Sequence, residues 1–450
     1  MSNTALRPGS VRRLVSSTVL GTTIEFFDVY IYGLAAGLYF GQLFFPGANA
    51  TIGMIASFAT LAVGFLVRPI GGVIGGHFGD RYGRKKVLVA SMMIMGASTF
   101  LVGVLPSYEA IGILAPILLI VARIAQGLGA GAEYGGGVLM LVEHMGKDRR
   151  GFWGSIANTG IWIGISIGTL FFAGLTRLPE DIQMWAWRAP FIASAVLVLV
   201  GLWIRLGVSE TPVFVKAEQQ AKASKRERLP LVDLFRNNKK AMVCAIFVAT
   251  GTASFQLYTT FATSYAKEID LDVSTILLFH FLNGLFAIAL TLFFGWLSDR
   301  TGRRPLVVIG SILVVPMLYL MFWAINQGNL PLILLTLLVL EIGHSMIYGP
   351  MGAFFAESFA TRARYTGVSI AYQVGGGAVS GLGPLIAASL LAQAGGPPHV
   401  YTVPLIVVVT GALATIGVLW APDRTGQPLI EDEDCEEPSE SEPLSSEARS

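Results

Sequence analysis

Apolar residues fill most of this chain in twelve long stretches that short polar segments separate. Each stretch is near or above the ~20 residues that an α-helix needs to cross a ~30 Å hydrocarbon core. The pattern therefore predicts an all-α membrane protein with twelve transmembrane helices. The expected spans are residues 15–42, 51–78, 87–106, 110–142, 152–175, 188–206, 241–266, 273–297, 305–326, 330–356, 365–393 and 399–421.

The composition agrees with a polytopic membrane protein. Of the 450 residues, 53% are hydrophobic and 13% are charged, whereas soluble domains carry about 25% charged residues. The two cysteines, Cys244 and Cys435, are too few for a disulfide framework or a zinc site. The chain also lacks a nucleophile elbow, a cluster of metal ligands and a phosphate-binding loop, so an enzyme is not expected.

Lysine and arginine gather in the segments on one predicted side. These segments precede the first span and follow every even-numbered span up to the tenth, while the other side holds only Arg177, Arg188 and Lys267. Basic loops stay in the cytoplasm. Both termini are therefore predicted to be cytoplasmic.

A glycine-rich basic turn occurs twice. Residues 75–86 read GGHFGDRYGRKK and residues 294–305 read FGWLSDRTGRRP, with the same order of Gly, Asp-Arg, Gly and two basic residues. Glycine permits a tight turn and a close approach of backbones, and the charges keep the turn in water. We expect a gating role for Gly76, Asp80, Arg81, Gly83, Arg84, Asp299, Arg300, Gly302 and Arg303.

A second pair of similar segments, beginning at Glu143 and Glu357, keeps the same order and the same side. The two pairs predict a parallel repeat of six plus six helices. The expected parts are a bundle over 1–206, a cytoplasmic linker over 207–240, a second bundle over 241–421 and a disordered acidic tail over 422–450, which has too few apolar residues to fold alone.

The paired turns resemble those of the major facilitator superfamily. Residues 21–33, GTTIEFFDVYIYG, and residues 122–136, ARIAQGLGAGAEYGG, are similar to its metabolite:proton symporter family, which includes 2-oxoglutarate, shikimate, citrate and proline/betaine permeases. The resemblance implies two pseudo-symmetric bundles in a bacterial plasma membrane that alternate access to a small metabolite. It also implies that Asp80 helps to hold the outward-open state through contacts with the other half.

The same resemblance implies that a proton gradient drives transport and that no cofactor is bound. The expected partners are the substrate, protons and the lipid bilayer, without nucleic acid, and nothing demands more than a monomer. Proton-coupled exporters carry a Gly-Pro pair in the fifth span, and residues 154–164 have no proline, which favours import. In that span, Gly160, Gly164 and Gly168 have the spacing of close helix packing.

Five ionisable residues lie inside the predicted N-terminal spans and away from their ends, namely Glu25, Asp28, Arg68, Arg123 and Glu133. Each costs roughly 2.5–3.5 kcal/mol unless it has a partner or water. Glu25 and Arg68 both lie about 18 Å from the charged layer at ~1.5 Å per residue, so they are expected to pair. Glu25 and Asp28 share a helix face by their spacing. Arg123 is expected to pair with Asp28 or to bind an anionic substrate.

Three acids face two arginines in this set, and an excess buried negative charge favours protonation. Glu133 or Asp28 is therefore the expected proton carrier, unless these charges only lock helices together. In the other half, Glu341 and His344 are three residues apart, and Glu341 occupies the repeat position of Arg123. Further candidates for the substrate site are Tyr32, Gln126, Tyr134, Gln256, Tyr372 and Gln373.

The leading functional hypothesis is proton-coupled uptake of a carboxylate-bearing metabolite. Two deep arginines favour a carboxylate, because a guanidinium binds it with two parallel hydrogen bonds. Import of a zwitterion of the proline/betaine type, with aromatic rings holding its cation, stays open. So does a proton-driven exporter of the same fold.

Overall fold

The computed structural model describes residues 8–47, 49–82, 84–131, 138–139, 141–142, 147–206, 238–427 and 429. All regular structure in these ranges is helical. The predicted all-α fold is thus confirmed for the described part of the chain. The linker between residues 207 and 237 and the tail from residue 430 lie outside the described residues, so the predictions for them stay predictions.

Ten described helices are long and apolar enough to cross a membrane. They are Val15–Phe44, Ala50–Gly75, Leu114–Gly131, Arg150–Leu175, Glu180–Leu202, Lys239–Glu268, Val273–Thr301, Arg303–Asn326, Leu330–Ser358 and Arg364–Gln393. Two shorter apolar helices, Val89–Val104 and Leu405–Trp420, occupy the third and twelfth predicted spans. Every predicted apolar stretch therefore contains a helix.

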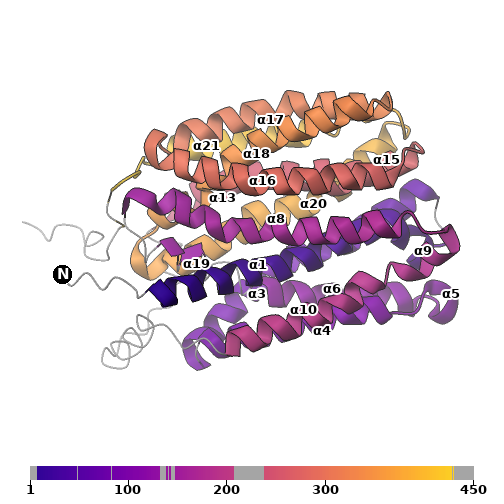
Figure 1. The fold of residues 1–450 in the computed structure, drawn as a ribbon, viewed down its shortest axis with the longest axis horizontal. Helices are drawn as coiled ribbons and strands as arrows, with labels where there is room; N and C mark the ends of the chain where they lie inside the picture. The colour runs from indigo at the N-terminus through magenta and orange to yellow at the C-terminus, as the bar shows by residue number, and fades with distance from the viewer. Residues whose placement is uncertain are drawn as a thin grey trace, which may run out of the picture.

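The helices run side by side along the long axis of the molecule (Figure 1). The N-terminal set consists of α1 (Pro8–Ala35), α3 (Ala50–Tyr82), α4 (Arg84–Val104), α6 (Leu114–Gly131), α8 (Arg150–Leu175) and α10 (Ala189–Leu206). The C-terminal set consists of α13 (Lys239–Thr250), α16 (Val273–Thr301), α17 (Arg303–Asn326), α18 (Leu330–Ser358), α19 (Thr361–Ala371), α20 (Val379–Gln393) and α21 (Leu405–Trp420). Short helices at the loops and within spans are α2 (Gly41–Phe44), α5 (Tyr108–Ile111), α9 (Glu180–Ala186), α14 (Ser254–Gln256) and α15 (Ala262–Glu268).

Helix α8 is the element through which the two sets meet most extensively. It lies between α1 and α16 (Figure 1), and α3 packs against α20 in a second contact between the sets. Glycines let α8 approach both neighbours. A Cβ atom at Gly164 would lie 2.3 Å from the carbonyl oxygen of Thr23 on α1, and one at Gly151 would lie 2.3 Å from that of Gly295 on α16. The predicted packing role of the glycine spacing is therefore confirmed.

In the described part of the chain, three π-helical segments widen the spans, namely η1 (Ala36–Phe40), η4 (Leu257–Phe261) and η5 (Tyr372–Ala378). Two of them, η1 and η4, interrupt the first and the seventh spans, which correspond in the six-plus-six repeat. A π-helical turn breaks the regular hydrogen-bond ladder and is often found at functional sites. Tyr372 and Gln373 belong to η5.

Candidate substrate site and contacts between the halves

Glu25 and Arg68 form an ion pair inside the N-terminal half. The Arg68 Nη1 atom on α3 lies 2.9 Å from the Glu25 Oε1 atom on α1, and both side chains are almost completely buried. The Phe65 ring covers the guanidinium, whose Cζ atom lies 4.6 Å from the ring centroid. This pair was expected from the equal depth of the two residues, and the structure confirms the contact. It neutralises one of the two central arginines.

Asp28 is buried on another side of α1. Its Oδ1 atom accepts a hydrogen bond from the Ser194 hydroxyl on α10 at 2.5 Å, and its Oδ2 atom accepts one from the Thr99 hydroxyl on α4 at 2.8 Å. Residues three apart differ by about 60° around a helix. Asp28 therefore reaches α4 and α10, although its spacing from Glu25 predicted a shared face.

Arg123 on α6 is held by neutral groups. Its guanidinium lies over the Tyr32 ring, with the Cζ atom 3.8 Å from the centroid, and it donates a hydrogen bond to the Gln126 amide oxygen. Its Nε atom has no hydrogen-bond partner among the described residues. Gly64 makes room for it, since a Cβ atom there would lie 2.7 Å from Nη2.

A chain of hydrogen bonds links Arg123 to Asp28. The Gln126 amide nitrogen donates to the Thr99 hydroxyl at 2.9 Å, and Thr99 in turn donates to Asp28. No carboxylate of the described residues lies within ion-pair distance of Arg123. Of the two roles expected for Arg123, the direct pair with Asp28 is not formed.

Gln373 brings the C-terminal half to Arg68. Its side chain is 1% exposed, and neither amide atom has a hydrogen-bond partner among the described residues. A Cβ atom at Gly377 would lie 3.0 Å from the Gln373 Oε1 atom and 3.9 Å from the Arg68 Cδ atom, so the two side chains are neighbours. The Tyr372 hydroxyl lies 3.2 Å from that of Tyr348.

Gln256 and the remaining candidates lie elsewhere or outside the described part. The Gln256 Oε1 atom accepts a hydrogen bond from the Thr260 hydroxyl on η4 at 2.6 Å. Glu133, Tyr134 and Gly83 lie outside the described residues, as do the side chains of Asp80, Arg81 and Arg84 and the surroundings of Gly76. Their roles stay predictions. Thr99 and Ser194 were not predicted, because nothing distinguishes them in sequence from other hydroxyl residues of apolar spans.

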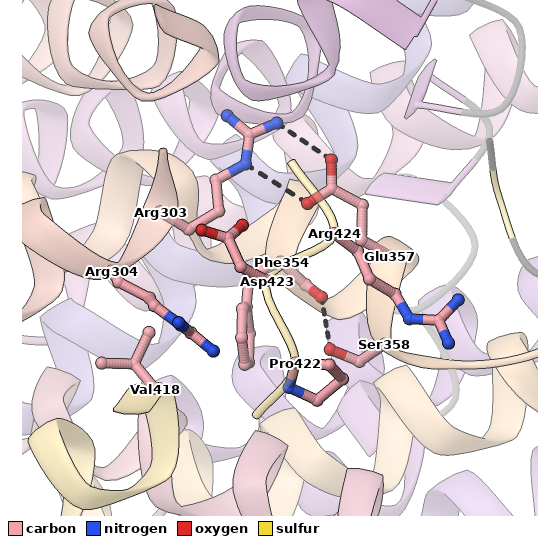
Figure 2. Close-up of a pocket in the computed structure, with 9 residues that line it drawn as sticks. All are labelled: Arg303, Arg304, Phe354, Glu357, Ser358, Val418, Pro422, Asp423 and Arg424. Atoms are coloured by element: carbon pink, nitrogen blue, oxygen red, sulfur yellow. Dashed lines mark hydrogen bonds and ion pairs between the residues drawn. The ribbon is translucent and has the colours of Figure 1, made fainter. Parts of the chain in front are cut away.

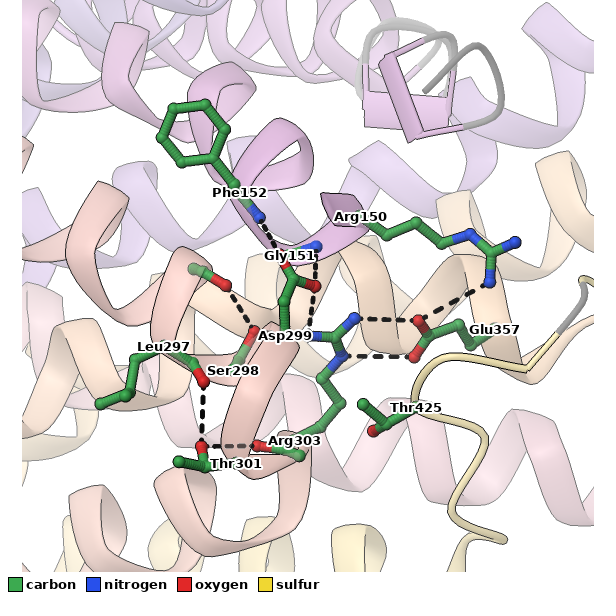
Figure 3. Close-up of polar contacts among 12 residues, drawn as sticks. Arg150, Gly151, Phe152, Leu297, Ser298, Asp299, Thr301, Arg303, Glu357 and Thr425 are labelled. Atoms are coloured by element: carbon green, nitrogen blue, oxygen red, sulfur yellow. Dashed lines mark hydrogen bonds and ion pairs between the residues drawn. The ribbon is translucent and has the colours of Figure 1, made fainter. Parts of the chain in front are cut away.

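The second copy of the glycine-rich turn joins the two halves (Figure 3). The Asp299 carboxylate at the end of α16 accepts hydrogen bonds from the backbone N–H groups of Gly151 at 2.7 Å and Phe152 at 3.0 Å. These groups are the first turn of α8, where unpaired donors and the helix dipole favour a negative charge. Asp299 therefore caps a helix of the other half.

Arg303 extends this contact to Glu357. Its Nη1 atom lies 2.9 Å from Asp299 Oδ1, while Nη2 and Nε donate to the two Glu357 carboxylate oxygens at 3.0 and 3.3 Å (Figure 3). Gly302, with φ of +87°, makes the turn between α16 and α17. The exposed Arg300 lies over the Trp296 ring, away from this contact. Of the four predicted residues of this turn, Asp299 and Arg303 thus make the ionic contacts here.

The chain after α21 covers the same end of the molecule, where Pro422, Asp423 and Arg424 lie beside Arg303, Arg304 and Glu357 (Figure 2). The Arg304 Nη2 atom donates to the Ala421 carbonyl oxygen at 2.5 Å, and the Arg150 Nη1 atom donates to that of Gln427 at 2.7 Å. Burial acts to raise the pKa of Asp423, but hydrogen bonds from Thr425 and the nearby Arg304 and Arg303 bring it below its usual value. Residues 422–427, assigned above to the disordered tail, therefore pack on the bundle, because arginines bind the carbonyl groups of Ala421 just before them and of Gln427 at their end.

The halves also touch at the opposite end. The Arg177 Nε atom donates to the Ser274 hydroxyl at 2.8 Å, and the Lys267 Nζ atom donates to the Leu38 carbonyl oxygen at 2.5 Å. A cavity of about 310 Å³ opens there between the halves, lined by Tyr39, Gln42, Thr176, Gln183, Lys267 and Ser274 among others. We call the two ends the Arg303 end and the Lys267 end.

A family model for the Major Facilitator Superfamily matches residues 18–380 and 243–446. The chain belongs to the Major Facilitator Superfamily. It is therefore a membrane transporter and not an enzyme, as the sequence predicted. Its described helices occupy all twelve predicted spans of this superfamily fold.

Curated relatives within the superfamily cover most of the chain. The inner membrane metabolite transport protein YhjE of Escherichia coli (strain K12) is 38% identical over 391 residues, which are 85% of this chain and 88% of that protein. The shikimate transporter of the same strain is 34% identical over 86% of this chain and 90% of its own length. The proline/betaine transporter of Escherichia coli (strain K12) is 32% identical over 86% of this chain and 79% of its own length.

Solved structures show the same superfamily fold. A D-xylose-proton symporter superposes with a TM-score of 0.71 at 17% identity, covering 93% of this chain and all of the other. An inward open form of the xylose transporter XylE from E. coli has a TM-score of 0.69 at 17% identity, covering 92% of this chain and 97% of the other. At this identity the likeness concerns the fold alone.

Proposed function

We propose that this transporter imports a small carboxylate-bearing metabolite together with protons across a bacterial plasma membrane by alternating access. The proposal rests on the surroundings of Arg123. Its side chain is a buried guanidinium, which stays charged at any physiological pH, and no described carboxylate neutralises it. A substrate carboxylate is the natural partner, because it accepts two parallel hydrogen bonds from a guanidinium.

The surroundings of Arg123 suit such a substrate. Gln126 holds one side of the guanidinium, while the Nε atom stays available for a second bond. The unpartnered Gln373 amide, next to Arg68, offers a donor and an acceptor for another polar group of the substrate. Arg68 itself is already paired with Glu25. Its part is therefore to join α1 to α3.

Asp28 is the candidate proton carrier that the described residues support. It is fully buried, its described partners are the hydroxyls of Thr99 and Ser194, and it reaches Arg123 only through Thr99 and Gln126. A substrate carboxylate that binds the Arg123 guanidinium changes the hydrogen bond between Arg123 and Gln126. Through Thr99, this changes the hydrogen bonds of Asp28. This path is a physical route for coupling. Glu133 keeps its predicted role as the other candidate.

The named relatives support this class of substrate without deciding it. A shikimate transporter is consistent with a carboxylate, whereas the proline/betaine transporters favour a zwitterion. In this chain Arg123 occupies the face of Tyr32, where the cation of a zwitterion would bind. We therefore propose a carboxylate as the substrate, and the transport assay includes zwitterions such as betaines as the alternative.

Purified protein in liposomes, with the outside acidic, tests the proposal. We expect accumulation of at least one labelled compound from a panel of mono-, di- and tricarboxylates, shikimate and betaines, and none after a protonophore removes the gradient. Arg123→Gln is expected to raise the KM by about a hundredfold, and Lys239→Gln, at an exposed cation, to leave it unchanged. No accumulation of any compound, or outward flux against the gradient, contradicts the proposal.

A further inference from the structure

Helix α18 carries another completely buried carboxylate, Glu341. Its Oε2 atom accepts hydrogen bonds from the Tyr258 hydroxyl on η4 at 2.9 Å and from the Asn283 amide on α16 at 3.0 Å. Its Oε1 atom accepts one from the Ser345 hydroxyl at 2.8 Å. The side chain is 0% exposed. Three elements of the C-terminal half therefore converge on this carboxylate, which lies outside the Arg123 site.

Glu341, like Asp28, differs from the buried acids Glu25, Asp299 and Glu357 in having no cationic partner among the described residues. Glu25 is paired with Arg68, and Asp299 and Glu357 are paired with Arg303. No lysine or arginine of the described residues lies within ion-pair distance of Glu341. The titratable groups of the packed elements nearer to Glu341 are Tyr258 on η4, His280 on α16, His344 and Tyr348 on α18, and Tyr30 on α1, which packs beside Phe255. Asp299 and Arg300 lie at the far end of α16, and Glu357 lies at the far end of α18.

Both charge states of Glu341 can satisfy their hydrogen bonds in this cluster. An ionised carboxylate accepts from all three donors, as observed. A protonated one keeps its acceptor oxygen for Tyr258 and Asn283 and donates its own proton to the Ser345 oxygen, because a hydroxyl both donates and accepts. An unpaired charge inside a span is costly, so the cluster suits a group that gains and loses a proton.

Ser345 connects this carboxylate to the other half. Its hydroxyl lies 3.4 Å from that of Thr291 on α16, and the Thr291 oxygen accepts a hydrogen bond at 3.0 Å from the Trp162 indole on α8. When Glu341 is protonated, Ser345 accepts from it and its own proton turns to Thr291. Proton binding is thereby transmitted to the contact between α16 and α8, the main interface of the halves.

We propose that Glu341 is a proton-binding site of the C-terminal half and carries a proton during each transport cycle. A proton passes from water on the acidic side to a Glu341 oxygen and stays on the neutral carboxyl group while the halves change the side to which the site is open. It then returns to water on the other side. The inference rests on the proposed proton-coupled import. It adds a proton site in the C-terminal half, at the repeat position of Arg123, to the anion site at Arg123 and the candidate proton carrier Asp28 of the N-terminal half.

Glu341→Gln tests the proposal, because glutamine keeps the shape and two acceptor sites but cannot be ionised. The probe is the labelled compound of the panel that the wild-type protein accumulates. We expect pH-driven accumulation to fall by about tenfold or more, while exchange of labelled for unlabelled substrate at equal pH continues. Retained accumulation overturns the proposal, and so does loss of both activities in a protein with the wild-type melting temperature. A wild-type protein that accumulates nothing contradicts the proposed function instead.

Ser345→Ala provides a second readout in case the first variant does not fold. It removes one donor that stabilises the ionised carboxylate, so the pH midpoint of uptake is expected to move upward. Thr336→Ala is the matched control, since that hydroxyl of α18 is buried and bonds only to carbonyl groups of its own helix. It is expected to leave the midpoint unchanged. Equal midpoints in all three proteins overturn the proposal.

Discussion

Arg68 and Arg123 carry the same charge, yet their surroundings assign them different tasks. Arg68 lies 2.9 Å from a carboxylate, whereas Arg123 lies on a tyrosine ring and bonds to an amide. A paired arginine holds its helices in place, and an arginine held by neutral groups can exchange one of them for an anion. We infer that the substrate meets Arg123 first and that Arg68 shapes the wall beside it.

The pair of Glu25 and Arg68 predicts the effect of charge removal. Glu25→Gln leaves a buried guanidinium without a counter-charge, which is expected to destabilise the protein by ~3–5 kcal/mol. The double variant Glu25→Gln with Arg68→Gln is expected to recover most of that loss, because no isolated charge remains. Thermal unfolding in detergent measures both. A double variant no more stable than Glu25→Gln would contradict a role of the pair in holding α1 to α3.

The sequence predicted this pair but not the partners of Asp28, and the difference has a physical reason. Depth follows from the rise per residue along each helix, so two residues at equal depth can be matched. Rotation about the helix axis decides which neighbour a side chain meets, and it depends on packing of the whole bundle. Ser194 and Thr99 therefore emerge only from the structure.

At the scale of elements, α8 governs the contact between the halves. It packs on α1 through Gly160 and Gly164, on α16 through Gly151, and its N-terminus binds Asp299. The glycine spacing indicated close packing of this span in advance. The second face against α16 was not predicted, because the same spacing fits one neighbour as well as two.

Gly164→Ala is expected to destabilise the protein by ~1–3 kcal/mol, because the new Cβ atom would meet the Thr23 backbone at 2.3 Å and α1 must move. Gly174→Ala in the same helix is the matched control, since its Cβ atom meets nothing within 4 Å. Alanine favours a helix over glycine, so the control is expected to be neutral or slightly more stable. Melting temperatures compare the two. Equal effects would show that close packing is not the cause.

Asp299→Asn tests the cap on α8. Asparagine keeps the size but has one acceptor oxygen and no charge, so one of the two backbone N–H groups loses its partner. Arg303 loses its ion pair with residue 299 and keeps the one with Glu357. We expect the maximal transport rate to fall more than tenfold while substrate affinity changes by less than about threefold. Uptake kinetics together with binding to detergent-purified protein separate the two. A pure loss of affinity would place Asp299 in the substrate site instead.

At the scale of the whole molecule, the membrane made the fold predictable. A bilayer admits backbone only as helices or closed barrels, so long apolar stretches define the spans. The turn motif that occurs twice indicates two halves. A gating role was expected for the turn at the Arg303 end, but the partners at the Arg303 and Lys267 ends could not be predicted, because they depend on how the two halves pack against each other. Alternating access requires the contacts at the two ends to break in turn, since substrate cannot pass while both are formed.

Proton movement that accompanies substrate entry is the most direct test of proton-coupled import at Arg123. Wild-type protein is placed in weakly buffered liposomes with no pH gradient. The carboxylate that it accumulated in the panel is added outside, and a pH electrode measures the pH of the external medium. Proton-coupled import at Arg123 predicts that the medium becomes alkaline as substrate enters, and that Arg123→Gln abolishes the signal at the same substrate concentration. Substrate entry with no change in external pH would contradict it.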